Sequence, residues 1–94
     1  MEMEYISRFF SQAQKDPRIS VTHIGLFAAL IRVFITGGMQ NPFRAFSYQV
    51  MPIAKISSTA TYHKCIRDLS DFGYINYLPS YKSKIGSSIG LIAN

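Results

Sequence analysis

A chain of 94 residues has room for one domain with a modest core, and 48% hydrophobic against 16% charged residues is a globular composition rather than a disordered one. The formal net charge is +5, and residues 44–94 carry six Lys and Arg against two Asp, so most of the charge lies in that half. Such a basic half suggests a polyanion as partner, although a merely soluble basic protein would have the same composition. A single cysteine, Cys65, excludes an internal disulfide and a zinc site built from several cysteines.

The first helix is expected over residues 3–14, where apolar side chains repeat at helical spacing before Asp16-Pro17. Thr22 can cap a second helix over Thr22–Thr36, which Gly37-Gly38 terminates. This second helix is apolar nearly all round, so it must be covered on most sides, either by the core or in part by a second copy of the chain.

A third helix is expected over Phe46–Ile56, after a turn at Asn41-Pro42. Pro52 lies inside that range, and an interior proline removes a hydrogen bond and costs about 3 kcal/mol. Two outcomes therefore stay open, a helix kinked at Pro52 or a helix that begins near it.

A fourth helix, capped by Ser57 or Ser58, is expected to end near Phe72, with Gly73 in the left-handed position after it. On a wheel of 100° per residue its core-facing stripe is Tyr62, Cys65, Ile66, Leu69 and Phe72. The opposite face carries Ala60, Lys64, Arg67 and Asp71, with His63 at its flank. Two strands are expected next, Tyr74–Leu78 and Ser87–Ile92, joined by a polar loop that carries Lys82 and Lys84.

The exposed face of this fourth helix has the pattern of a helix that reads DNA. Small and hydroxyl side chains stand at its start, where a helix approaches base edges closely, and two cations follow. The alternative is an ordinary solvated face with the helical pairs Lys64–Asp68 and Arg67–Asp71. The position of the helix between a two-serine turn and a hairpin favours DNA binding. We expect major-groove contacts from Ser58, Thr59, Ala60, Thr61, His63, Lys64 and Arg67, and backbone or minor-groove contacts from Lys55, Lys82 and Lys84.

The run Ser58-x-x-Thr61-Tyr62, followed by Ile66-x-x-Leu69-x-x-x-Gly73-Tyr74-Ile75, resembles the winged helix-turn-helix of bacterial regulators. In those families a Ser/Thr-capped recognition helix ends in leucine, three residues, glycine and an isoleucine that opens the wing. The resemblance covers residues 46–92, and Pro52 departs from the usual pattern. The run Thr61-Tyr62-His63-Lys64-Cys65 is similar to small winged-helix proteins on mobile elements of Bacteroidetes-type bacteria.

The resemblance implies a single winged-helix domain over residues 1–94, mainly α with a small β-hairpin wing, in which residues 1–45 form N-terminal helices and a possible dimer surface. It implies sequence-specific binding of double-stranded DNA, by a small transcriptional regulator or an accessory protein of a mobile element. A homodimer would suit this function, since two recognition helices can read a pseudo-palindrome. Whether the first helix packs within the monomer or across a dimer stays open.

An enzyme is not expected, and neither a cofactor nor a metal site is. His63 and Cys65 are two positions apart on a helix and point to different sides, so they cannot act as a base and its nucleophile. We expect Cys65 to be buried and inert, and His23 to cap or pack. The main alternative function is a winged-helix protein-interaction module without DNA binding, because the first two helices carry much apolar surface.

The longest apolar segment, residues 24–35, has 12 positions and contains Gly25 and Arg32, so it is too short to span a bilayer. The start of the chain, Met1-Glu2-Met3-Glu4, is acidic and lacks the basic and apolar regions of a signal peptide. We therefore expect a cytoplasmic protein without membrane contact.

Overall fold

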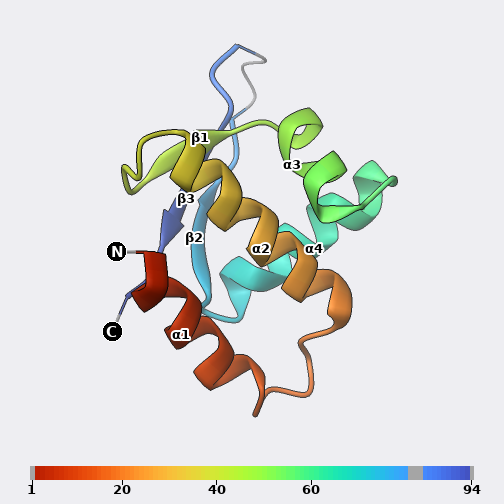
Figure 1. Cartoon of the computed structure of the whole chain (residues 1–94). Helices are drawn as coiled ribbons and strands as arrows, with labels where there is room; N and C mark the ends of the chain where they lie inside the picture. Colours follow the sequence, from red (N-terminus) through yellow and green to blue (C-terminus); the bar gives the residue numbers. More distant parts are fainter. Residues whose placement is uncertain (1, 81–83, 94) are drawn as a thin grey trace.

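The structure is a computed structural model that describes residues 2–80 and 84–93, and these form a mainly helical domain with a small three-stranded antiparallel sheet (Figure 1). In chain order the elements are α1 (Glu2–Ala13), α2 (Val21–Thr36), β1 (Phe43–Ala45), α3 (Ser47–Ala54), α4 (Thr59–Asp71), β2 (Ile75–Leu78) and β3 (Ser87–Leu91). The four expected helices and the final hairpin are all present within a residue or two of their predicted ends. None of these four helices is long and apolar enough to cross a membrane.

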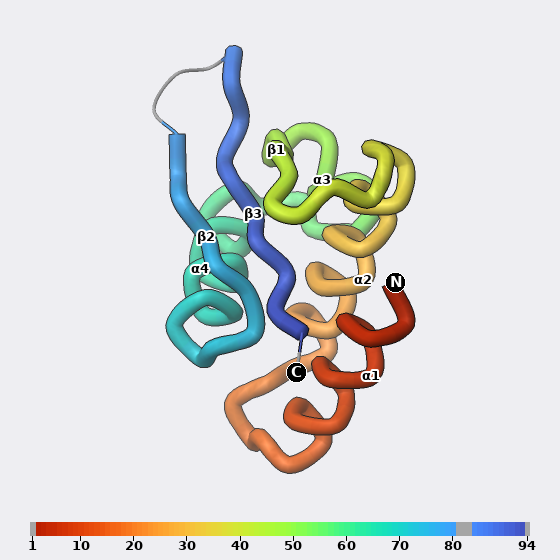
Figure 2. The backbone as a smooth tube through the Cα atoms, turned by 90° about the vertical axis from the view of Figure 1, so that its left-hand side faces the viewer, coloured from red at the N-terminus to blue at the C-terminus, as the bar shows by residue number. Residues whose placement is uncertain are grey.

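The expected β2–β3 hairpin is present, and β1, which was not expected, adds a third strand to it. β3 lies between β1 and β2, and it pairs antiparallel with both (Figure 2). The Asn41 side chain fixes the chain before β1, because its amide donates to the Leu91 carbonyl and its carbonyl accepts the Leu91 N–H, both at 2.8 Å. On the outer edge of β2, the Tyr77 N–H donates to the Ser70 hydroxyl at 3.3 Å.

The N-cap of α2 is Ser20, so the expected cap at Thr22 is wrong. The Ser20 hydroxyl accepts the backbone N–H of His23 at 3.4 Å, and Nδ1 of His23 accepts the backbone N–H of Ser20 at 3.0 Å. This is a capping box in which histidine takes the place of the usual Glu or Gln. The cap therefore lies two residues before the predicted Thr22, and the helix itself begins one residue before it, at Val21.

Helix α3 starts at Ser47 and keeps Pro52 inside its last turn, which rules out a helix that begins at Pro52. Proline lacks an N–H, so α3 forfeits the bond that residue 52 would donate to the Tyr48 carbonyl. The helix then stops at Lys55, whose φ of 62° lies in the left-handed region. The proline thus falls where α3 is about to end.

The core is organised around α2, as its apolar composition predicted, with α1, α3 and α4 packed against it. The Phe9 ring from α1 stacks on Phe27 of α2 at 4.0 Å between centroids and meets Tyr74 at 5.2 Å. The most deeply buried large side chains are Phe9, Leu26, Leu30, Val50, Ile66, Leu69, Ile75 and Ile89.

A polar clamp joins the α1–α2 connection to the residues between α4 and β2. The Asp16 carboxylate accepts two bonds from the Arg18 guanidinium, both at 2.9 Å, and one from the Tyr74 hydroxyl at 2.8 Å. The same guanidinium lies 4.0 Å above the centre of the Phe72 ring. The hydrogen bonds from Arg18 hold the pKa of Asp16 well below its usual range, whereas burial and the bond to Asp16 raise the pKa of Tyr74 to about 12.

Acid is expected to weaken this clamp. The Asp16 pKa is lower in the folded protein than the value of about 3.9 in an unfolded chain, so the carboxylate stabilises the fold above that pH. Its contribution is lost as the pH falls toward the folded-state pKa. Thermal unfolding should therefore show a higher Tm for wild type than for Asp16→Asn near neutral pH, and a smaller difference at about pH 3. A difference of equal size at both pH values would contradict this account.

Candidate nucleic-acid interface

The two faces of α4 are divided as the helical wheel predicted. Its inner stripe, Tyr62, Cys65, Ile66 and Leu69, is buried, while Phe72 just beyond it is half-buried. On the outer side Ala60, Lys64, Arg67 and Asp71 are exposed, and His63 is half-buried at the flank. The wheel therefore identified which side chains of this helix a partner can reach.

Ser58 caps α4, which decides between the two serines. Its hydroxyl accepts the Thr61 N–H at 3.3 Å, and its carbonyl accepts the Tyr62 N–H at 3.0 Å. The backbone N–H groups of Thr59 and Ala60 precede the first intrahelical donors, and both residues are exposed. These donors and the helix dipole make this end of α4 favourable for an anion such as a phosphate.

The two cations of the outer face differ in their partners. Lys64 forms an ion pair with Asp68 at 3.0 Å, and the hydrogen bond with that carboxylate raises the lysine pKa. Arg67 has no side-chain partner among residues 2–80 and 84–93, and the pair with Asp71 that the alternative interpretation required is not formed there. Arg67 thus presents its full set of donors to solvent.

Asp68 is also the point at which α4 is joined to α2, a contact that sequence reasoning missed. Because Nδ1 of His23 accepts the Ser20 N–H, Nε2 carries the hydrogen and donates to Asp68 at 2.9 Å. The hydrogen bonds from His23 and then from Lys64 lower the pKa of Asp68. His23 was expected to cap or to pack, and it does both.

The remaining predicted residues lie around the start of α4 and on the hairpin. Lys55 and Lys84 are exposed, and Lys82 lies outside the described residues. Nδ1 of His63 donates to the carbonyl of Thr59 at 2.9 Å, so this ring is tied to its own helix. Arg44 on β1 was counted only as part of the basic half, yet it is exposed and its guanidinium donates to the Gly86 carbonyl of the hairpin at 3.4 Å.

A hollow of about 320 Å³ separates the first turns of α4 from the loop end of the β2–β3 hairpin, and we call it the α4–hairpin hollow. It is lined by Ala45, Phe46, Ser47, Tyr48, Tyr62, His63, Tyr77, Ser80, Gly86 and Ser87. Tyr62 is only 3% exposed, and within the described residues its hydroxyl makes no hydrogen bond. No fully enclosed side-chain nitrogen or oxygen in that part of the chain lacks a partner, so this hydroxyl reaches solvent at the hollow. Burial raises its pKa to about 12, which keeps it a donor at neutral pH.

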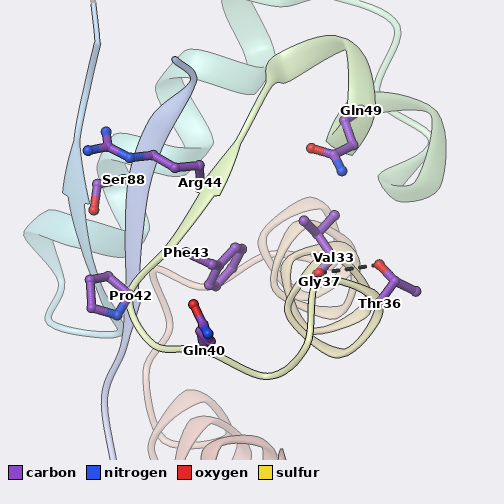
Figure 3. Close-up of a pocket in the computed structure, with 9 residues that line it drawn as sticks. All are labelled: Val33, Thr36, Gly37, Gln40, Pro42, Phe43, Arg44, Gln49 and Ser88. Atoms are coloured by element: carbon purple, nitrogen blue, oxygen red, sulfur yellow. Dashed lines mark hydrogen bonds between the residues drawn. The ribbon is translucent and has the colours of Figure 1, made fainter.

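A larger groove of about 490 Å³ lies between the end of α2, β1 and α3 (Figure 3). Two of its polar side chains already bond to backbone groups at helix ends. The Thr36 hydroxyl donates to the Arg32 carbonyl at 3.0 Å, and the Gln49 side chain accepts the Phe46 N–H at 3.3 Å. Figure 3 shows Arg44 directed across β3, away from Thr36 and Gln49. We therefore assign no site to this groove.

Cys65 is 6% exposed, and burial raises the pKa of its thiol, which keeps it protonated at neutral pH. Within residues 2–80 and 84–93, no three His, Cys, Asp or Glu side chains are grouped so that they could hold a metal ion.

Comparison with protein-family models, curated proteins and solved structures gave no match.

Proposed function

We propose that this chain is a winged helix-turn-helix domain that binds double-stranded DNA, with α3 and α4 as the helix-turn-helix and the β2–β3 hairpin as the wing. The order of these elements and the small antiparallel sheet are compatible with that arrangement. Helix α4 would enter the major groove, and the hairpin would lie along the backbone or the adjacent minor groove. The domain would serve as a small transcriptional regulator or as an accessory protein of a mobile element.

The α4–hairpin hollow is the observation that carries this proposal. It brings Tyr62 and His63 of α4, the start of α3 and the loop end of the β2–β3 hairpin to one surface. A DNA strand that runs from the groove filled by α4 to the groove beside the hairpin would pass over this hollow. There it would meet the Tyr62 hydroxyl, while the free N–H groups at the start of α4 and the exposed Arg67 and Lys84 would be available to phosphates beyond the hollow.

Fluorescence anisotropy of a labelled random duplex, measured at low and at physiological salt, tests the proposal. Wild type should bind with a dissociation constant on the order of micromolar at low salt, and the affinity should fall steeply as salt rises. The double variant Lys64→Ala/Arg67→Ala should lose most of this binding, because both cations stand on the face that would enter the groove.

The matched control removes two positive charges from the other half of the chain. Lys15 and Arg32 are exposed and lie outside α3, α4 and the hairpin, so Lys15→Ala/Arg32→Ala should bind nearly as wild type does. An equal loss in both double variants would indicate unspecific charge attraction and would remove α4 from the interface. Absence of binding at low salt in wild type would refute DNA binding altogether.

A protein-interaction module without DNA binding is the second candidate. The observation that favours it is an apolar groove between α1 and α2, which no charged side chain lines. If wild type does not bind DNA, this groove becomes the main functional surface of the chain.

A further inference from the structure

Five of the described side chains that line the α4–hairpin hollow carry aromatic rings. Phe46 and Tyr48 at the start of α3 stack on each other, with 5.0 Å between the ring centroids and 28° between the ring planes. Tyr62 of α4 meets His63 edge-on at 5.2 Å, and Tyr77 of β2 also lines the hollow. None of the described residues in this lining is Lys, Arg, Asp or Glu. The hollow therefore suits an uncharged, flat ring system.

The hairpin side of the hollow is closely fitted around Gly86. Its φ is 76°, and a Cβ at this position would lie 3.1 Å from the Ala45 carbonyl oxygen and 3.3 Å from the Phe46 ring. The Arg44 guanidinium donates to the Gly86 carbonyl at 3.4 Å. Because only glycine lets the hairpin backbone come so close to the Phe46 ring, this side of the hollow is formed in the free protein.

The fold leaves one donor and one acceptor of the hollow unused. The Tyr62 hydroxyl makes no hydrogen bond within the described residues, although the side chain is only 3% exposed. The His63 ring gives its Nδ1 hydrogen to the Thr59 carbonyl, so in the neutral ring Nε2 is an acceptor, and it too has no partner in the described chain. Buried polar groups of proteins are nearly always paired, so an unpaired hydroxyl beside a hollow indicates a ligand that pairs with it.

The surroundings of the hollow are positively charged, although its described lining is not. Lys84 is exposed two residues before Gly86, and Arg44 is exposed beside the Gly86 carbonyl. A nucleotide has the same division, because its flat base is uncharged and carries donors and acceptors along its edge, whereas its phosphate is an anion. The volume of about 320 Å³ lies at the lower end of the range of small-ligand sites, about 300–1,000 Å³, and so suits a single base.

We propose that the α4–hairpin hollow binds one unpaired nucleobase, which stacks on its aromatic side chains and bonds to the Tyr62 hydroxyl. A base inside a duplex is stacked and paired and cannot enter the hollow, whereas a base that is already unpaired can. With DNA as the source of the base, the inference rests on the proposed function and implies a preference for duplexes that carry an extra, unpaired nucleotide. A free nucleoside would bring the same ring to the hollow without DNA.

Anisotropy of three short labelled duplexes of one sequence tests DNA as the source. One duplex is fully paired, one carries a single extra adenine, and one carries an extra abasic nucleotide, which lengthens the backbone equally but brings no base. Wild type should bind the adenine duplex about 10-fold more tightly than the abasic duplex, as expected for one stacked base. Tyr48→Ala should abolish this preference, because it removes an exposed ring of the lining. Tyr62→Phe should reduce the preference about 3- to 10-fold, because it removes one hydrogen bond.

Tyr5→Phe is the matched control, because it removes a tyrosine hydroxyl from α1, which does not line the hollow. It should keep the wild-type preference for the adenine duplex. Tyr62→Phe should keep the wild-type Tm in circular dichroism, since its hydroxyl has no partner to lose within the described residues. A clear fall in this Tm would mean that the hydroxyl is already bonded inside the protein, which overturns its role toward a base.

Titration of adenosine into the free protein, followed by the NMR signals of the histidine rings, tests the nucleoside as the source. The His63 signals should shift to saturation, and less so in Tyr62→Phe, while those of His23 stay unchanged because that ring is bonded to Asp68 outside the hollow. A saturating shift without any preference for the adenine duplex would identify the free nucleoside as the occupant.

Equal binding of the adenine and abasic duplexes, together with unchanged His63 signals, overturns the proposal and leaves duplex binding standing. If wild type binds no duplex at all, the proposed function fails, and the adenosine titration alone decides whether the hollow takes a base.

Discussion

Replacing Phe9 with alanine is expected to lower the free energy of unfolding by about 3–5 kcal/mol. Its ring is 1% exposed and stacks on Phe27 at 4.0 Å, with Tyr74 beside it at 5.2 Å. Through these contacts one side chain joins α1 to α2 and to the residue that precedes β2. Alanine would leave a cavity with three aromatic neighbours, and the rigid rings around it can fill little of that space. Urea denaturation followed by circular dichroism measures the loss.

Phe10 provides a matched control from the next position of the same helix. Its ring is 46% exposed and meets Phe9 edge-on at 5.1 Å, so Phe10→Ala should cost less than about 1 kcal/mol of monomer stability. Because Phe10 also lines the apolar groove between α1 and α2, both variants should be compared at two protein concentrations, which separates monomer stability from association. Equal losses in the two variants would mean that α1 does not dock through Phe9.

Arg67→Ala is expected to reduce the affinity for DNA by about 1–3 kcal/mol, roughly 5- to 150-fold. Arg67 is exposed on the outer face of α4 and has no partner among the described residues, so its guanidinium can give all of its donors to bases or phosphates. Titration of the same labelled duplex with the single variant measures the loss.

Lys64→Ala should have a smaller effect, although it removes the same charge from the same face. The Lys64 ammonium lies 3.0 Å from the Asp68 carboxylate, so part of its interaction with DNA would replace an existing ion pair. Equal losses from the two single variants would show that the pair with Asp68 does not restrain Lys64. Unchanged binding in both would sink the assignment of α4 as the helix that contacts DNA.

Helices whose apolar residues repeat at helical spacing could be predicted from the sequence. The period of apolar residues located α1 and α4, the pair Ser57-Ser58 marked where α4 is capped, and Gly73 marked where the chain turns into β2. β1 could not be predicted, because three residues are too few to show an alternating pattern and only pairing with β3 makes them a strand. The cap of α2 was missed since histidine replaces the Glu or Gln of the usual capping box.

The candidate site also has features that could be predicted from the sequence and features that could not. The exposure of Lys64 and Arg67 follows from the geometry of a single helix, so the wheel predicted it correctly. The partner of each cation depends on side chains brought in by tertiary packing, and the bond between His23 and Asp68 joins positions 45 residues apart. The α4–hairpin hollow and the place of Arg44 beside the hairpin likewise exist only once three elements have packed together.

The bond between the Tyr77 N–H and the Ser70 hydroxyl also bears on the aggregation of the chain. An edge strand with free outward N–H groups can pair with a strand of another molecule and so start an unwanted extended sheet. The strand β2 has four residues, and the Ser70 hydroxyl of α4 accepts the outward N–H of one of them, Tyr77. Ser70 belongs to the same helix that packs on β2, so the acceptor is held beside the strand. Helix α4, which would contact DNA on its outer face, thus also protects the β2 edge from pairing with a strand of another copy of the chain.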